Sequence, residues 1–166
     1  CMNHADVFFQ RYLPDEQATN ELGAELAAVL LENKDEILSS GLNIRLCGDL
    51  GAGKTTLTRA LLRALGFEGR VKSPTFTLLE PYSIDGFTLN HFDFYRFEDP
   101  EEFEDAGFRE NFGPGRVCVT EWTQKAEPLV PGADLMISLL PKDDGREVQV
   151  SALTDHGVRI VRGLER

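Results

Sequence analysis

The residues whose types and spacing best fit a chemical task are 48–55, which match the phosphate-binding loop pattern G-x-x-x-x-G-K-[ST] at every required position. Glycines such as Gly51 and Gly53 let successive backbone N–H groups approach a phosphate chain, because no side chain holds the backbone away. In such a loop Lys54 spans the β- and γ-phosphates, and the Thr55 hydroxyl ligates magnesium. The loop therefore predicts a binding site for a nucleoside triphosphate with magnesium.

Two elements must hold this loop, and the flanking sequence predicts both. Ile44, Leu46 and Cys47 indicate a strand that leads into the loop, and apolar residues within 57–65 fall on one face of a helix that leaves it. The helix begins near Lys54 and adds its positive N-terminal end to the site. An ordinary glycine turn is the alternative. We favour the phosphate loop because strand, loop and helix come in the required order.

Two acidic residues are each expected at the end of a buried strand. Asp93 ends one apolar strand, and Glu121 ends the strand expected over residues 116–120. Nucleotide hydrolases use acidic residues at such strand ends to hold magnesium or to orient water against the γ-phosphate. The sequence leaves open which carboxylate has which role. Trp122, the one tryptophan of the chain, is expected beside this site.

Weaker signals surround these two acids. Residues 71–77 follow the loop helix and contain a proline between the hydroxyl residues Ser73 and Thr75. Nucleotide hydrolases place switch segments there, with a threonine able to sense the γ-phosphate and magnesium. An ordinary turn explains the stretch as well. His91 and Arg96 are most simply explained as a packed, hydrogen-bonded histidine and an arginine paired with an acidic neighbour.

The pattern as a whole predicts one domain over residues 1–166, with a P-loop NTPase-like α/β fold: a mixed central sheet, flanking helices and a C-terminal antiparallel portion. Residues 7–12 are expected to form a first strand. A helix is expected to start with Asp15 as its N-cap and to run until Gly41 ends it.

Further elements are expected in the second half of the chain. Residues 77–83 and 87–92 flank an Asp-Gly step and predict a hairpin. Residues 99–104 indicate the start of a short acidic helix. Residues 108–115, with two phenylalanines and a Gly-Pro-Gly turn, suggest a mobile flap rather than core. Residues 158–164 are expected to add an edge strand.

Length and charge limit the range of functions. A chain of 166 residues, of which 42% are hydrophobic, can bury one sizeable core. A formal net charge of −11 argues against binding a nucleic-acid backbone alone, because that binding depends on neutralising phosphates with lysine and arginine. If RNA is involved, we expect a partner to hold it.

Cysteine usage and hydropathy indicate the compartment. Cys47 and Cys118 lie in apolar strand patterns without metal-ligand spacing, so we expect buried, reduced thiols. The longest apolar run, residues 26–31, is too short to span a bilayer, and no secretory segment precedes the first acidic residues. We therefore expect a cytoplasmic protein. Cys1, in front of Met2, is expected to be a cloning remnant and is left out of the fold prediction.

Five segments, in their order and spacing, resemble the bacterial TsaE family, also called YjeE. They are residues 48–56, 72–76, 91–96, 99–102 and 121–122. The resemblance runs from about Leu13 to about Ala152, which is nearly the whole chain. A phosphate loop alone would be generic, but its combination with S-P-T-F, H-F-D-x-Y-R and E-W is specific. The family is the ATPase component of tRNA N6-threonylcarbamoyladenosine biosynthesis.

The resemblance implies a magnesium-dependent ATPase that uses ATP and assists the TsaB and TsaD pair, which modifies an adenosine in the anticodon loop of certain tRNAs. The protein would meet tRNA only through these partners. The implied magnesium ligands are Thr55 and Glu121. The implied catalytic residues are Lys54, Thr56, Asp93 and Glu121. The implied nucleotide-binding residues are Glu16, Gly51, Ala52, Gly53, Lys54, Thr55, Thr56 and Arg146. No arginine is evidently poised as a finger, so we expect slow turnover alone and stimulation by partners.

Other functions remain as alternatives at the level of sequence. A small-molecule or nucleoside kinase would share the phosphate loop, but it usually carries an arginine-rich lid, and only scattered arginines follow Arg96. A nucleotide-gated adaptor would bind without hydrolysis. A GTPase is disfavoured because residues 33–36 lack the final aspartate of the guanine motif N-K-x-D and lie upstream of the loop.

Overall fold

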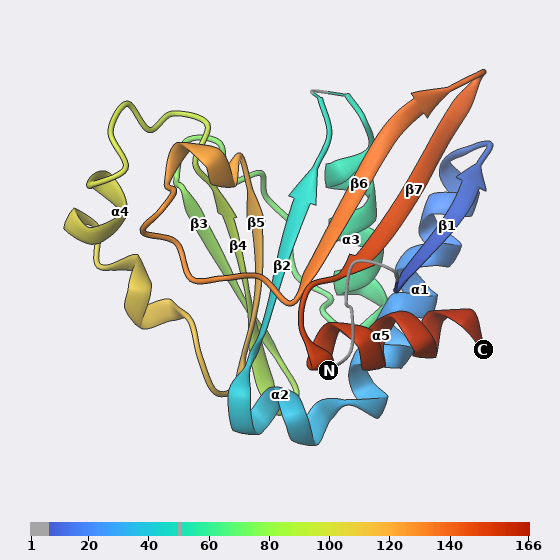
Figure 1. The fold of residues 1–166 in the computed structure, drawn as a ribbon, viewed down its shortest axis with the longest axis horizontal. Helices are drawn as coiled ribbons and strands as arrows, with labels where there is room; N and C mark the ends of the chain where they lie inside the picture. The colour runs from blue at the N-terminus through green and yellow to red at the C-terminus, as the bar shows by residue number, and fades with distance from the viewer. Residues whose placement is uncertain (1–6, 50) are drawn as a thin grey trace.

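The computed structural model describes residues 7–49 and 51–166, and it is built on one seven-stranded mixed sheet (Figure 1). Cys1 and Leu50 lie outside the described residues. The strands are β1 (Phe8–Leu13), β2 (Leu42–Cys47), β3 (Leu79–Ile84), β4 (Phe87–Asp93), β5 (Arg116–Glu121), β6 (Leu135–Lys142) and β7 (Gly145–Ala152). Their order across the sheet is β1-β7-β6-β2-β5-β4-β3. The expected mixed sheet is confirmed.

The centre of the sheet is parallel and its margins are antiparallel. Strand β2 pairs in parallel with β5 and β6, and β4 pairs in parallel with β5. The β3–β4 and β6–β7 pairs are antiparallel, as the hairpin and the C-terminal pattern predict, and β1 pairs with β7 in antiparallel as well. Because β2, β4 and β5 run in the same direction, their carboxyl ends meet at one edge of the sheet. Ligands of open α/β sheets bind at that edge.

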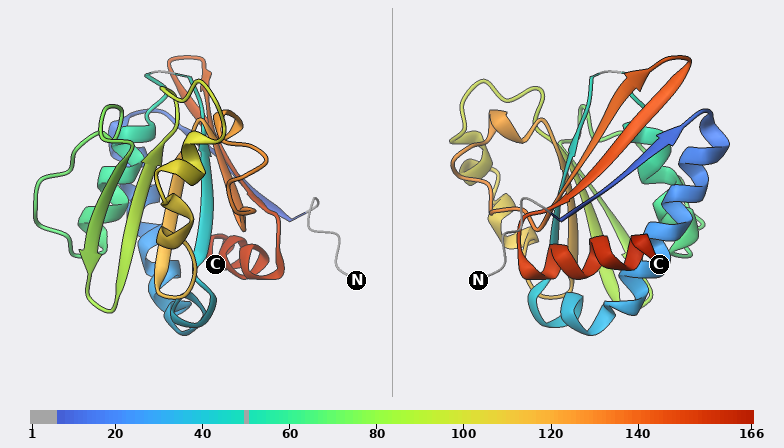
Figure 2. Two further views of the ribbon diagram at one scale, coloured as in Figure 1. Left: turned by 90° about the vertical axis from the view of Figure 1, so that its left-hand side faces the viewer. Right: turned by 45° about the vertical axis from the view of Figure 1, so that its right-hand side comes forward.

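Helices flank the sheet. They are α1 (Glu16–Glu32), α2 (Lys34–Ser40), α3 (Lys54–Ala64), α4 (Glu102–Asp105) and α5 (Asp155–Glu165), with 3-10 turns η2 (Phe108–Asn111) and η3 (Thr123–Lys125). Helices α1 and α3 lie side by side, so closely that a Cβ atom on Gly23 would come within 2.5 Å of the Ala60 Cβ (Figure 2). Helix α5 packs against β7, β1 and α1.

The expected N-terminal helix is present but divided. Asp15 caps it as predicted, since its Oδ1 accepts a hydrogen bond of 2.9 Å from the Ala18 N–H. The first helix, α1, ends at Glu32, and Asn33 adopts φ −104° and ψ 20° before α2 begins. The chain then leaves α2 at Gly41, whose φ is 77°.

The expected edge strand at 158–164 is wrong, because this segment belongs to α5. The Thr154 hydroxyl caps the helix by accepting from the Gly157 N–H at 3.1 Å. Val158 and Ile160 alternate as in a strand, but Val158, Val161 and Leu164 recur at helical spacing and are all buried. The β-branched content favoured the strand prediction; burial of a helical face overrides it.

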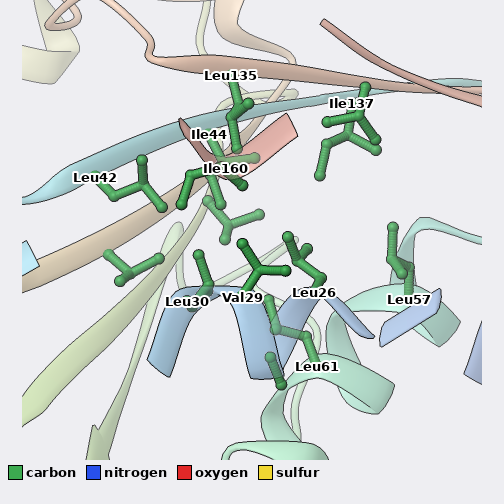
Figure 3. Packing of buried hydrophobic residues seen from close by; sticks show 14 of the residues in the cluster. Leu26, Val29, Leu30, Leu42, Ile44, Leu57, Leu61, Leu135, Ile137 and Ile160 are labelled. Carbon is green, nitrogen blue, oxygen red and sulfur yellow. The ribbon is translucent and has the colours of Figure 1, made fainter. Parts of the chain in front are cut away.

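The main core lies between the sheet and the helix layer formed by α1 and α3. Figure 3 shows apolar side chains of both helices meeting those of β2, β6 and α5. The labelled residues, all buried, are Leu26, Val29, Leu30, Leu42, Ile44, Leu57, Leu61, Leu135, Ile137 and Ile160. This packing fixes β2 against α3 and therefore fixes both ends of the glycine loop that connects them.

A second, aromatic core replaces the expected mobile flap. Phe92 and Phe103 are buried, and Phe108 and Phe112 pack against them. The ring centroid of Phe92 lies 5.2 Å from that of Phe108 and 5.1 Å from that of Phe112. The 108–115 segment is thus held by packed rings, which anchor the region beyond β4.

Two further predictions from the sequence concern the state of the cysteine thiols and the absence of a segment that could span a membrane. Cys47 and Cys118 are both free, as expected; Cys118 is fully buried, while Cys47 is half-buried. Burial raises the pKa of the Cys118 thiol to about 12. Across residues 7–49 and 51–166, no helix combines the length and the apolar character that crossing a membrane would need.

Candidate nucleotide-binding site

The glycine loop lies where β2 ends, at the carboxyl edge of the parallel strands. Gly51 has φ 81° and Gly53 has φ 97°, which are left-handed conformations that a side chain would strain. Gly53 then precedes the first residue of α3, Lys54. The α3 backbone therefore presents its first N–H groups toward the loop, which is the arrangement that attracts phosphate.

A cavity of about 240 Å³ opens beside this loop. It is lined by Gly51, Gly53, Lys54, Thr55, Thr56, Ser73, Thr75, Asp93, Glu121, Trp122 and Arg146. The lining comes from the loop and α3, the segment before β3, the ends of β4 and β5, and the start of β7. Residues far apart in the sequence, most of them expected at the site, are thus brought to one cavity.

Two expected residues stand outside that cavity. Ala52 is buried, and its N–H donates to the Asp49 carbonyl at 3.0 Å, so it shapes the loop from within. Glu16 lines a neighbouring cavity of about 510 Å³ between α1 and α3. That cavity shares Thr56 with the first. Glu16 therefore lies next to the phosphate-sized cavity, on the side of Thr56.

Lys54 and Glu121 form a buried ion pair at the centre of the site. The Lys54 Nζ atom lies 3.3 Å from the Glu121 Oε1 atom, and both side chains are 7% exposed. The Lys54 Nζ atom also lies 5.1 Å from the ring centroid of Trp122. The Lys54 ammonium is thus held between a carboxylate and an aromatic face, and Lys54 lines the cavity.

Glu121 has a second partner, His91, whose Nε2 atom lies 2.5 Å from the Glu121 Oε2 atom. Burial raises the pKa of the Glu121 carboxyl, but the hydrogen bond from His91 and the nearby charges of His91 and Lys54 outweigh it, so the pKa is lowered overall. Glu121 is therefore a carboxylate at neutral pH.

Asp93 has a different environment although it lies beside Glu121. The two are register partners on β4 and β5. The Asp93 Oδ1 atom accepts from the Tyr95 N–H at 2.9 Å, and its Oδ2 atom lies 3.5 Å from the Thr75 hydroxyl. Burial raises the pKa of Asp93, the Tyr95 N–H lowers it, and the charge of Glu121 raises it again; the net direction is upward. In the described part of the chain Asp93 makes no ion pair.

The segment between α3 and β3 reaches the site through hydroxyl groups. Ser73 and Thr75 both line the cavity, and their hydroxyl oxygens lie 2.8 Å apart. Pro74 between them restricts the backbone, so the two hydroxyls point to the same place. The position expected of a switch segment is therefore met; its response to a nucleotide stays a prediction.

The β6–β7 hairpin contributes Arg146. Its Nη2 atom donates to the Gly51 carbonyl at 2.9 Å. Its guanidinium also lies against Gly53, where an added Cβ would come within 3.2 Å of the Arg146 Nε atom. Glycine at this position thus makes room for the arginine. Arg146 stabilises the loop and faces the same cavity.

Sequence reasoning underestimated His91, whereas Trp122 lies beside the site as expected. His91 lies two positions before Asp93 on β4, and side chains two apart share a face of a strand, so this spacing was the signal for a link to the site. Trp122 adopts φ 55° and ψ 42°, a left-handed conformation that is uncommon without glycine. Strain of this kind concentrates at functional sites, but no sequence pattern shows it.

The oxygen-rich lining fits magnesium that arrives with a nucleotide. In the described residues no group of three or more His, Cys, Asp or Glu side chains could hold a metal by itself. Magnesium usually takes one or two protein oxygens and completes its shell with phosphates and waters. Thr55 and Glu121, which both line the cavity, carry such oxygens.

A larger cavity of about 380 Å³ adjoins the site and shares Lys54 and Trp122 with it. It is lined further by Arg45, Met136 and residues of η3, and it contains neither Asp93 nor Glu121. The hydroxyl groups and strand-end acids that phosphate chemistry needs gather in the smaller cavity.

The parallel centre of the sheet, the glycine loop between β2 and α3, and the acids at the ends of β4 and β5 define a P-loop NTPase-like α/β protein. Residues 13–148 match the family of the threonylcarbamoyl adenosine biosynthesis protein TsaE, and the chain belongs to that family.

Individual relatives agree. The tRNA threonylcarbamoyladenosine biosynthesis protein TsaE of Haemophilus influenzae is 42% identical over 151 residues, which cover 91% of this chain and 94% of that protein. The protein of the same name from Bacillus subtilis is 39% identical over 120 residues, covering 72% and 75%. The crystal structure of Bacillus subtilis YdiB superposes with a TM-score of 0.72 at 28% identity, covering 96% of this chain and 95% of that one.

Proposed function

We propose that this protein is a magnesium-dependent ATPase of tRNA threonylcarbamoyladenosine biosynthesis that acts on the TsaB and TsaD pair. Membership of the TsaE family supports the pathway. The observation that carries hydrolysis is the convergence of Lys54, Thr55, Asp93 and Glu121 on one cavity beside a glycine loop. The cytoplasmic location expected from the sequence is part of this proposal.

The site residues can divide the work of phosphoryl transfer. Loop N–H groups and the start of α3 bind the phosphates. Lys54 breaks its ion pair with Glu121 and contacts the phosphates instead. Thr55 and Glu121 hold magnesium, which when bound neutralises charge that develops on the phosphates. We assign Glu121 to the metal because its pKa is lowered. We assign the attacking water to Asp93, which lacks a cationic partner among the described residues and has a raised pKa.

The arginines of the chain support slow turnover in isolation. Of the residues that line the cavity, Arg146 is the one arginine, and it is tied to the Gly51 carbonyl on the loop. An arginine finger must instead contact the transferring phosphate. We therefore expect the partner pair to raise the ATPase rate, either by supplying a cation or by ordering the Ser73–Thr75 segment.

The test is the ATPase rate of the wild type and of Asp93→Asn, measured while TsaB and TsaD are titrated in. The expected result is stimulation of the wild type and none of the variant, because asparagine keeps the shape of Asp93 but cannot act on water as a carboxylate. Equal wild-type turnover with and without the pair, over a range of concentrations, would contradict the proposal. Full partner function of Asp93→Asn would instead indicate a nucleotide-gated adaptor.

A further inference from the structure

We propose that His91 is a positioning residue that fixes the Glu121 side chain so that one carboxylate oxygen, Oε1, faces the phosphate cavity and serves magnesium. The inference deepens the proposed function, because it rests on Glu121 as a ligand of the metal. His91 does not line the cavity, so it would not contact a bound nucleotide.

The strands place His91 behind Glu121. His91 and Asp93 are two apart on β4 and share a face of the sheet, and Glu121 is the register partner of Asp93 on β5. Asp93 and Glu121 line the cavity, whereas His91 is absent from its lining and its side chain is 3% exposed. The histidine therefore acts on the site through Glu121.

Hydrogen-bond chemistry determines the direction of the contact. A carboxylate can only accept, so the His91 Nε2 atom donates to Oε2 across 2.5 Å. The other ring nitrogen, Nδ1, is buried without a hydrogen-bond partner among the described residues. Buried polar atoms normally have partners. A histidine that only filled the core would have no reason to bear this cost, so its contact with Glu121 is the feature that requires an imidazole.

The remaining freedom of Glu121 is small. Its backbone carbonyl accepts from the Phe94 N–H at 3.1 Å, which fixes the end of β5 against the chain that leaves β4. With Oε2 held by His91, Oε1 is the oxygen that lies toward Lys54, at 3.3 Å. When Lys54 turns to a phosphate, Oε1 stays in the cavity. Magnesium, which takes its ligands in a strict octahedral geometry, is served by one well-placed oxygen.

Two amide variants separate this role from simple packing. In His91→Gln the side-chain nitrogen is the same number of bonds from Cα as Nε2, so it can still donate to Oε2. In His91→Asn the amide is one bond shorter and cannot reach. Both replacement side chains are polar and uncharged. A purely structural effect of losing the imidazole would therefore appear in both variants, whereas loss of the hydrogen bond to Glu121 would appear only in His91→Asn.

The experiment measures the affinity of each protein for N-methylanthraniloyl-ADP, once with saturating magnesium and once with a chelator. We expect the wild type and His91→Gln to gain similar affinity from magnesium. For His91→Asn we expect that gain to fall by roughly tenfold, as is common when the partner of a metal ligand is removed. Without magnesium the three proteins should bind alike.

Each outcome bears on the inference. Equal magnesium gains in all three proteins, or equal losses in both variants, would overturn it while the proposed function stands. A wild type that binds no nucleotide with magnesium would remove the proposed function itself. If neither variant folds, nitrogen NMR of the wild-type histidines provides the check. We expect a proton on the His91 Nε2 atom that exchanges slowly with solvent, and a proton on Nδ1 alone would overturn the inference.

Discussion

At the scale of single residues, the site separates two neighbouring carboxylates. Asp93 and Glu121 are register partners, yet their pKa values shift in opposite directions. Glu121 is surrounded by Lys54 and His91, whereas Asp93 has backbone and hydroxyl contacts. Groups whose environments move their pKa values apart are suited to different roles. The arrangement therefore suggests the division of labour that the sequence left open.

The raised pKa of Asp93 predicts a conflict between stability and activity. In the folded protein the charged form of Asp93 is disfavoured, so Asp93 lowers stability at pH values above its folded pKa. Asp93→Asn should raise the free energy of unfolding at pH 7 by about 1 kcal/mol while abolishing turnover. Denaturant unfolding measures the first effect. As the pH falls through the raised pKa, the folded protein begins to take up a proton on Asp93 and the difference between the two proteins shrinks. It should vanish below the ordinary aspartate pKa of 3.8. A variant less stable than the wild type at pH 7 would contradict the assignment.

Trp122 should report the exchange of partners at Lys54. The Lys54 Nζ atom lies 5.1 Å from the indole ring, and the chain contains one tryptophan. If magnesium-ADP binds as proposed, Lys54 should move toward phosphate, and the emission of Trp122 should change on titration. Lys54→Met should lose this response, because it lacks the charge that the phosphates attract. Lys125→Met is the matched control: its ammonium lies over Tyr95, at 5.8 Å, and the response should persist. An unchanged response in Lys54→Met would argue against the exchange.

At the scale of elements, the β6–β7 hairpin supports the glycine loop from a distance in sequence. Arg146, the second residue of β7, donates to the Gly51 carbonyl at 2.9 Å. Arg146→Ala should weaken ATP binding by roughly tenfold, the equivalent of one charge-assisted hydrogen bond. The turnover number should change less, because Arg146 contacts the loop rather than the end of the phosphate chain.

The matched control for that variant lies on the same hairpin. Lys142 pairs with Glu147 at 2.9 Å, is exposed, and does not line the cavity. Lys142→Ala removes a cation of the hairpin without touching the loop, so the KM for ATP should stay unchanged. Steady-state kinetics of both variants measures the difference. A similar rise of KM in both would show that net charge, rather than the contact to Gly51, sets the affinity.

Elements also show what the sequence could predict. The strand before the glycine loop, the helix after it and the two strand-end acids follow from local patterns, so they were predicted. The α5 helix was missed because its β-branched residues imitate a strand until tertiary burial selects the helical face. The sequence of the 108–115 segment indicates a flap, because the contacts of Phe92 with Phe108 and Phe112 form only once the chain is folded.

Site contacts between distant elements were equally hidden. Nothing in the spacing of Arg146 predicts its hydrogen bond to Gly51, since the two meet through the order of β7, β6 and β2 in the sheet. The ion pair of Lys54 with Glu121 needs the parallel pairing of β2 and β5. Periodicity assigns a residue to a face, but the topology of the sheet decides which faces meet.

At the scale of the whole molecule, net charge determines whether the protein can bind RNA by itself. The formal net charge is −11, and five of the described arginines pair with carboxylates: Arg11, Arg45, Arg109, Arg159 and Arg166. Arg159 of α5 lies beside Glu36, and Arg166 contacts Glu32 at 3.1 Å. Paired arginines have little left to offer a phosphate backbone. Binding to RNA requires cations that neutralise phosphates and release counterions, and the 28 acidic residues of the chain outnumber its 17 lysines and arginines.

The isolated protein is therefore expected to leave labelled tRNA unbound in a filter or gel-shift assay, even at low salt where electrostatic binding is strongest. With TsaB and TsaD present, the tRNA should be bound by the assembly, because the partners would supply the basic surface. A titration of salt distinguishes the two sources of binding. Tight binding by the protein alone, falling steeply as salt rises, would show that its local cations outweigh its net charge, and that the protein meets tRNA directly rather than through its partners.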